Sequence, residues 1–279
     1  MSRAELGSWA RELDDFVRAL SGAYIFGVPL LFTMEVWWIG TYADLWKLLA
    51  FLGVAFAANL GLTHAVGFKR ETTFGTTINQ AVDAVAVGIV AAFVMLLVLN
   101  RITLSDPLDS VLGKVVVQAV PLSIGASVAN EILGQRGEKS RQGQEGRRPG
   151  AWRAFFSDVG ATIIGGIFIG FSIAPTQEVP MLAAGLEYPH VLALIGFSLM
   201  VSYAIVFASG FDQQRSEGLF QRPITETTLA YLIALLVALV TLYFFDRIEI
   251  GDPLPFVVEQ TLVLGFPTAV GGAAGRLVI

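Results

Sequence analysis

Two glutamates, Glu35 and Glu178, stand within or directly after long apolar stretches of the chain, and a threonine precedes each of them by two residues. An ionisable side chain in a membrane span is costly to hold in lipid and commonly marks an ion or proton path. Carboxylate and hydroxyl oxygens suit hard cations better than copper or zinc. We therefore predict that Glu35, Glu178, Thr33 and Thr176 bind a small inorganic cation.

The expected place of the glutamates within their spans bears on this prediction. Both should lie in the last turn of a span, and Pro180 should end the fifth span, which carries Glu178. The helix dipole disfavours negative charge in a last turn. Helix capping would then not explain them. Pro29 and Pro175 lie a few residues upstream, and a proline inside a helix frees a backbone carbonyl that could add a neutral ligand. The alternative is an ordinary interfacial glutamate that reaches water at the lipid headgroups.

A second group of acidic residues lies near the expected cytoplasmic ends of two spans. Asp83 is about one turn inside a span that should begin near Asn79, and Glu226 takes the place in the second half that Gln80 takes in the first. We interpret Asp83 and Glu226 as an inner gate or a proton-handling site. The alternative for Asp83 is a carboxylate stabilised by the positive end of the helix dipole.

Composition excludes several kinds of chemistry. The chain has no cysteine and two histidines, His64 and His190. Disulfides, cysteine-ligated metals and thiol catalysis are therefore ruled out, and a histidine metal centre is not expected. The sequence has no phosphate-binding glycine loop, serine nucleophile motif or histidine–glutamate zinc motif. We expect no enzymatic activity, no cofactor, no structural metal and no nucleic-acid partner.

Hydropathy places the chain in a lipid bilayer. Of its 279 residues, 54% are hydrophobic and 15% are charged, whereas soluble domains carry about 25% charged residues. The sequence predicts an all-α polytopic membrane protein with eight transmembrane helices, since each span needs about 20 residues. The predicted spans lie near residues 18–38, 45–66, 79–100, 107–133, 154–178, 189–210, 224–245 and 253–277.

Four segments are expected along the chain. Residues 1–17 read as an amphipathic helix at the membrane interface, because apolar and charged side chains alternate there at helical spacing. Residues 18–133 hold the first four spans and residues 151–279 hold the last four. Residues 134–150 are polar and glycine-rich, which is typical of a linker, here on the cytoplasmic side.

The two halves repeat one another in sequence. Residues 101–125 align without a gap with residues 247–271, an offset of 146, and Glu35 aligns with Glu178 at an offset of 143. Four spans return the chain to the same side of the membrane, so the repeats run parallel, related by a pseudo-two-fold axis along the membrane normal. Such an axis would place Glu35 and Glu178 at one depth, facing each other near the outer end of a central path.

Two repeated dipeptides, Asp106–Pro107 and Asp252–Pro253, have a structural interpretation. Aspartate is a favoured helix N-cap, and proline is favoured at the first helical position. We predict that these dipeptides begin the fourth and eighth spans and take no part in ion binding.

The basic residues predict the orientation in the membrane. Fourteen of the 18 lysines and arginines fall on one side of the predicted spans and four fall on the other. Basic residues accumulate on the cytoplasmic side, so both termini should be cytoplasmic and the glutamates should lie near the outer face. That face is rich in acidic residues, which would raise the local cation concentration. Positive-inside sorting alone would also leave it acidic.

The tandem motifs Pro29-Leu-Leu-Phe-Thr-Met-Glu-Val-Trp37 and Ala174-Pro-Thr-Gln-Glu-Val179 resemble a family of bacterial integral membrane proteins of unknown function. The resemblance covers most of the chain from about residue 10. It implies a multi-pass protein of the bacterial inner membrane and brings no activity with it. Phe156-Ser157-Asp158 is similar to a motif of the endolysosomal potassium channel family. Those channels have six spans per repeat, and Arg153 stands one residue too close to the motif, so this likeness implies an ion path and no more.

Taken together, these patterns predict an integral membrane cation channel or transporter with a paired-glutamate site. Its partners would be a small cation and the lipid bilayer, and a homo-oligomer is compatible with the sequence. The alternative is a non-transporting membrane scaffold or assembly protein, which would recruit partners through the linker at 134–150. Ion flux through the purified protein would separate the two.

Overall fold

The computed structural model describes residues 3–67, 74–129, 151–208 and 223–277, which form helices joined by short turns, without a strand in these ranges. The all-α prediction is therefore confirmed for the described part of the chain. The chain divides into two compact units. The predicted linker at 134–150 lies outside the described residues.

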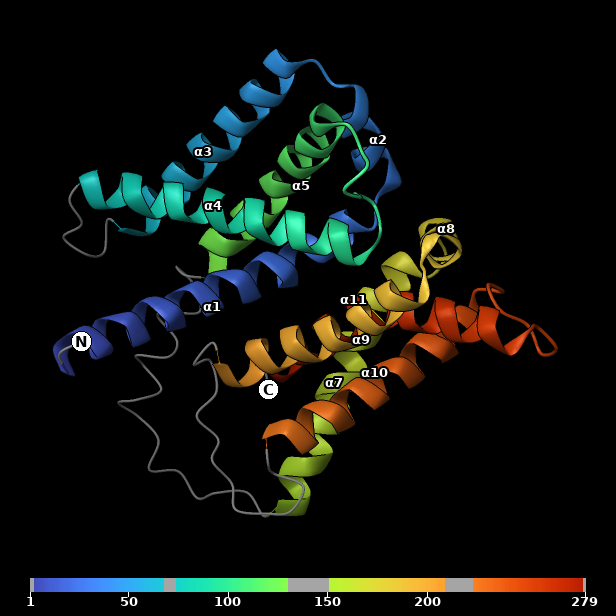
Figure 1. Cartoon of the computed structure of the whole chain (residues 1–279). Helices are drawn as coiled ribbons and strands as arrows, with labels where there is room; N and C mark the ends of the chain where they lie inside the picture. The colour runs from blue at the N-terminus through green and yellow to red at the C-terminus, as the bar shows by residue number, and fades with distance from the viewer. Residues whose placement is uncertain (1–2, 68–73, 130–150, 209–222, 278–279) are drawn as a thin grey trace. The chain divides into compact units, whose positions relative to one another are not determined.

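The first unit comprises Met1–Leu97, Arg101–Ser140 and Ala208–Gly210. The helix α5 is its centre, packing against α1, α2 and α3 (Figure 1). Residues 3–17 belong to the same continuous helix as the first predicted span. The helices are α1 (Arg3–Leu31), α2 (Met34–Tyr42), α3 (Leu45–Gly67), α4 (Phe74–Val98) and α5 (Leu108–Val128).

The second unit comprises Val98–Asn100, Arg141–Phe207 and Phe211–Ile279. Its last helix, α11, packs against α7, α8, α9 and α10. A π-helical turn, η2 (Ala204–Ala208), continues α9. The helices are α7 (Ala151–Ile173), α8 (Glu178–Gly185), α9 (Tyr188–Tyr203), α10 (Pro223–Phe244) and α11 (Leu254–Arg276).

Glycines allow the central helix of the first unit to approach its neighbours closely. A Cβ atom at Gly125 of α5 would lie 2.7 Å from the carbonyl oxygen of Gly22 in α1, and one at Gly113 would overlap the carbonyl oxygen of Gly40 in α2. Small residues at such crossings allow the backbones of membrane helices to come into contact. The positions of α1 and α2 against α5 therefore depend on these four glycines.

The second unit has a matching crossing. A Cβ atom at Gly271 of α11 would overlap the carbonyl oxygen of Gly165 in α7. Gly165 follows Gly22 by 143 residues and Gly271 follows Gly125 by 146 residues. These are the offsets that relate the glutamates and the 101–125 segment, so glycines at repeat-related positions make the same kind of contact inside each unit.

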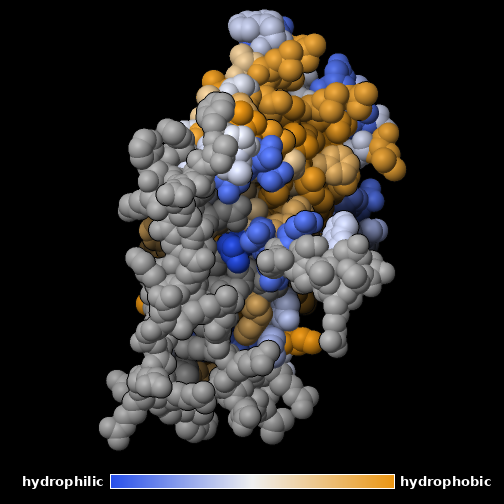
Figure 2. All heavy atoms as spheres, turned by 90° about the vertical axis from the view of Figure 1, so that its left-hand side faces the viewer, coloured by the Kyte–Doolittle hydropathy of each residue, from blue (hydrophilic) through white to orange (hydrophobic). Residues whose placement is uncertain are grey.

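Helix length and hydropathy agree with a membrane-spanning protein. Within the described ranges, seven helices are long and apolar enough to cross a bilayer, and an eighth span results if α1 and α2 count as one bent span. The exposed residues of α3 include Leu45, Trp46, Leu49 and Val54, and Figure 2 shows apolar side chains gathered over the upper part of the face it displays. Such side chains suit contact with lipid tails.

Candidate functional site

Glu35 lies at a sharp break in the first unit. The helix α1 ends at Leu31, α2 begins at Met34, and the axis turns by 89° between them. Thr33 is the N-cap residue of α2, with an extended backbone and no capping bond from its side chain. Glu35 is exposed in the first turn of α2. The prediction that it lies in the last turn of a span is therefore wrong.

Glu178 occupies the corresponding place in the second unit. The helix α7 ends at Ile173, and Glu178 is the first residue of α8, with Pro180 in the same turn. Pro180 was predicted to end the fifth span, but it lies near the start of α8. Unlike Glu35, Glu178 is buried. The positive end of the helix dipole favours both carboxylates, so the argument that helix ends cannot explain them is also wrong.

Side chains occupy the last carbonyls of α1. The Thr33 hydroxyl donates to the Pro29 carbonyl oxygen over 3.3 Å, and the Trp37 indole N–H donates to the Leu31 carbonyl oxygen over 2.9 Å. These two hydrogen bonds hold α2 against the end of α1. The carbonyl that Pro29 was expected to free for a cation is a different one, in the preceding turn of α1.

A buried glutamine reaches the same break from α5. Gln118 Nε2 lies 3.4 Å from the carbonyl oxygen of Leu30, which also accepts the backbone N–H of Thr33 over 3.3 Å. Gln118 is 0% exposed, and its Oε1 has no hydrogen-bond partner among the described residues. An amide oxygen buried in this way retains its full capacity to accept a proton donor or a cation.

An arginine reaches the break in the second unit. The Arg247 guanidinium, in the turn between α10 and α11, donates to the carbonyl oxygen of Pro175, and the Thr176 hydroxyl donates to the Ile173 carbonyl oxygen over 2.7 Å. This carbonyl is therefore held by Arg247. It is not the carbonyl that the proline was expected to free for a cation, which belongs to the preceding turn.

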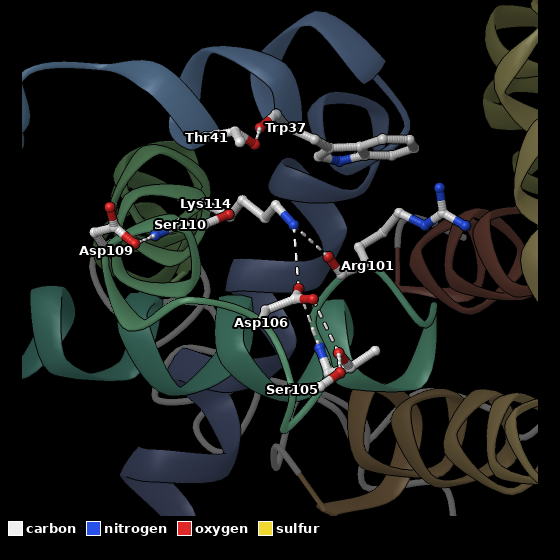
Figure 3. Close-up of polar contacts among 9 residues, drawn as sticks. Trp37, Thr41, Arg101, Ser105, Asp106, Asp109, Ser110 and Lys114 are labelled. Carbon is white, nitrogen blue, oxygen red and sulfur yellow. Dashed lines mark hydrogen bonds and ion pairs between the residues drawn. The ribbon is translucent and has the colours of Figure 1, made fainter.

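The repeat-related arginine of the first unit, Arg101, is placed differently. Its guanidinium carbon lies 5.6 Å from the centre of the Trp37 ring, within cation–π range. Burial lowers the pKa of Arg101 from its ordinary value, and a guanidinium remains charged under such conditions. Figure 3 shows the Arg101 side chain extending beside the Trp37 ring.

The loop before α5 is fixed by Asp106. Its carboxylate accepts the Thr103 hydroxyl over 2.9 Å and the Thr103 backbone N–H over 3.3 Å, and it pairs with Lys114 Nζ over 3.4 Å (Figure 3). Lys114 Nζ also donates to the carbonyl oxygen of Arg101 over 2.8 Å. The hydrogen bond from the Thr103 hydroxyl is the main cause that lowers the pKa of Asp106.

The predicted N-cap role of the two aspartates needs correction. Pro107 and Pro253 are the N-cap residues of α5 and α11. The carboxylate of Asp252 accepts the backbone N–H of Glu249 over 2.8 Å, as Asp106 does from a residue three positions back. Both aspartates therefore close the turn before the helix, because proline has taken the capping position itself.

Asp83 lies farther inside its helix than the sequence suggested. Because α4 begins at Phe74, Asp83 falls in the third turn, where it is exposed. The dipole effect fades within the first turn, so it does not stabilise this carboxylate. No hydrogen bond or ion pair of Asp83 is found with the described residues.

Glu226 belongs to an ion cluster in the second unit. It lies in the first turn of α10 and pairs with Arg276 of α11, whose guanidinium also lies 3.8 Å from the carboxylate of Asp158 in α7. The guanidinium carbon of Arg276 is 5.9 Å from the ring centre of Phe207, in the π-helical turn. The cluster thus ties α7, α10 and α11 together at one end of the unit.

Three participants at the breaks were not predicted from the sequence as members of the site. Gln118 is a single amide inside an otherwise apolar run, and Arg101 and Arg247 were recognised only as landmarks of the repeat. A signal was available for each, because a polar residue within a span is uncommon, as is a basic residue on the side predicted to face outward.

Comparison with known proteins places the chain in one group. A family model described as integral membrane protein DUF2391 matches residues 15–279. No curated protein and no solved structure matches the chain. The match covers both breaks, both glutamates and every described helix beyond the first turns of α1.

Proposed function

The chain belongs to a family of integral membrane proteins of unknown function, as the tandem motifs had predicted, and we propose that it is a cation channel or transporter. The carboxylates of Glu35 and Glu178 would bind the ion near the outer face of a bacterial inner membrane. The chain would cross that membrane as two parallel four-span repeats about a pseudo-two-fold axis, with both termini in the cytoplasm.

One observation carries this proposal. In each unit the first long helix breaks, and a glutamate lies in the first turn of the short helix that follows. Broken helices in transporters commonly line the substrate or ion site, because irregular backbone at membrane depth is tolerated only beside a cavity or inside protein. A carboxylate at such a break is the group expected in a cation path.

The threonines support a cation ligand set. The hydroxyl protons of Thr33 and Thr176 are already donated to carbonyl oxygens at the ends of α1 and α7. A hydroxyl that donates its one proton keeps its oxygen lone pairs for an acceptor role. Hard cations take such oxygens together with carboxylates. The two threonines therefore complement Glu35 and Glu178.

Asp83 and Glu226 have separate parts in the proposal. Asp83 is an exposed carboxylate in a membrane-spanning helix, which suits a group that exchanges protons. Glu226 is held by Arg276, which suits a contact that opens and closes an inner gate. Exchange of Glu226 for glutamine should weaken this contact, whereas exchange of Asp83 for asparagine should change proton coupling alone.

The proposal is tested with purified full-length protein in liposomes. Flux of potassium, sodium, calcium and protons is measured with and without a pH gradient, against protein-free liposomes. We expect flux of at least one of these cations above the protein-free level. Absence of flux for all four would contradict the proposal and favour the scaffold alternative. Dependence of the flux on a pH gradient would indicate a coupled transporter.

A further inference from the structure

We propose that Gln118 is a further ligand of the cation site, supplied to the break in the first unit by α5. The inference rests on the proposed function and adds a neutral oxygen to the carboxylate and hydroxyl already assigned. Its starting point is the contact of Gln118 Nε2 with the carbonyl oxygen of Leu30, over 3.4 Å.

The contact with Leu30 fixes which way the amide faces. A carbonyl oxygen accepts protons only, so the nitrogen of the Gln118 amide must point toward Leu30, and Oε1 must point away. Oε1 is buried and accepts no hydrogen bond from the described residues. A buried acceptor without a partner is unfavourable, so the position calls for a group that supplies positive charge or a proton.

The neighbours of Gln118 favour a cation as that group. The Leu30 carbonyl oxygen is shared between Gln118 and the backbone N–H of Thr33. Thr33 in turn stands two residues before Glu35. Amide oxygens are ordinary ligands of hard cations alongside carboxylates. Gln118 thus brings a third type of oxygen donor on a side chain whose amide nitrogen already contacts the break.

The second unit lacks this ligand. The repeat-related residue, at the offset of 146, is Leu264, which is buried in α11. An arginine lies near each break, Arg101 beside Trp37 in the first unit and Arg247 at Pro175 in the second. The breaks differ in the amide, which only the first receives from the helix that carries Gln118.

The chain supplies its own test substitution and control. Gln118→Leu introduces the residue that the second unit carries at the related position. Gln260→Leu is the matched control, because Gln260 is also 0% exposed with an amide that lacks partners among the described residues. No contact of Gln260 with a break carbonyl is found in the described part of the chain. Each variant removes one buried amide, from α5 in Gln118→Leu and from α11 in Gln260→Leu.

Binding is measured by the thermal unfolding midpoint of the full-length protein in detergent. Potassium, sodium and calcium chloride are titrated separately at constant ionic strength, with N-methylglucamine as the replacing cation. We expect at least one of the three to raise the wild-type midpoint. Gln118→Leu should weaken the apparent Kd for that cation about tenfold, as expected for loss of one oxygen that faces a charge. Gln260→Leu should leave the Kd unchanged.

A third variant keeps the test decisive if Gln118→Leu does not fold. Gln118→Glu keeps the oxygen and adds a charge, so it should shift binding toward calcium relative to sodium. The inference is overturned if Gln118→Leu and Gln260→Leu bind alike, or if Gln118→Glu leaves the ion preference unchanged. It is also overturned if no cation stabilises the wild type, since Oε1 would then hold water at most.

The binding result and the flux result can fail separately. Cation binding that depends on Gln118, without flux in liposomes, would support the ligand and contradict a channel or transporter. Flux that is unchanged in Gln118→Leu, with an unchanged Kd, would leave the proposed function standing and remove Gln118 from the site.

Discussion

The Arg247 guanidinium donates a hydrogen bond to the backbone carbonyl of Pro175, at the point where α7 gives way to α8. This contact links the turn between α10 and α11 to the break that carries Glu178. The charged donor satisfies one of the two lone pairs of this carbonyl oxygen.

Removal of Arg247 should loosen the second break. Arg247→Met leaves the Pro175 carbonyl without its donor, which should lower the free energy of unfolding by about 1–3 kcal/mol. The thermal unfolding midpoint in detergent measures this. Lys47→Met is the control, because Lys47 forms an exposed pair with Asp44 and such pairs contribute little. Equal midpoints for the two variants would show that the contact with Pro175 does not stabilise the unit.

The glycine crossings should tolerate no side chain. Gly125→Ala and Gly271→Ala each place a methyl group against a carbonyl oxygen of the neighbouring helix, which should cost about 1–3 kcal/mol of stability. Gly196→Ala is the control in α9, where nothing lies within 4 Å of the added atom, and it should be neutral or stabilising. A loss of stability in all three variants alike would argue against a specific role for the crossings.

The contribution of Asp106 should depend on pH. Its hydrogen bond from Thr103 lowers its pKa in the folded state from the ordinary value of 3.8. A carboxylate with a lowered folded pKa stabilises the fold above its unfolded pKa and loses that contribution as the pH falls through the folded pKa. The wild type should therefore be more stable than Asp106→Asn at neutral pH, and the difference should shrink below about pH 4. Ion preference should be the same in both proteins.

The orientation can be tested by labelling, because the chain has no cysteine of its own. Ser105→Cys lies in the exposed turn before α5, on the predicted outer side, and Gly75→Cys lies at the start of α4, on the predicted inner side. An impermeant thiol reagent added to intact cells should label the first and spare the second. The reverse pattern would overturn the predicted topology.

The sequence predicted the helices well and the breaks poorly. Long apolar runs gave the all-α fold and most spans, since hydropathy depends on composition alone. An apolar run has the same hydropathy whether its helix continues straight or bends. The 89° turn between α1 and α2 could therefore not be predicted from hydropathy. Glu35 and Glu178 were therefore found as residues but assigned to the wrong end of a helix.

Other features depended on contacts that no pattern within one segment reveals. Gln118 and Leu30 are 88 positions apart in sequence, and Arg247 and Pro175 are 72 apart. The repeat did relate Arg101 to Arg247, yet one stacks on Trp37 and the other donates to a carbonyl. Equivalent sequence positions thus did not predict equivalent contacts.

The revised position of the glutamates changes the expected stability of their variants. Both carboxylates lie in the first turn of a helix, where a negative charge is worth about 0.3–1 kcal/mol. Glu35→Gln and Glu178→Gln should therefore lower the thermal midpoint slightly and leave the fold intact. A midpoint above the wild type would show that the dipole does not stabilise these groups.

The measurement that tests the central claim most directly is cation flux in liposomes for Glu35→Gln, Glu178→Gln and the double variant. Glu187→Gln, an exposed glutamate nine residues after Glu178, serves as the control. If both carboxylates bind one ion, each single variant should reduce flux, and the double variant should lose less than the sum, with a coupling of roughly 0.5–3 kcal/mol. Glu35→Gln should have the larger effect, because Gln118 supports its break. Wild-type rate and selectivity in both single variants, as in Glu187→Gln, would contradict the account.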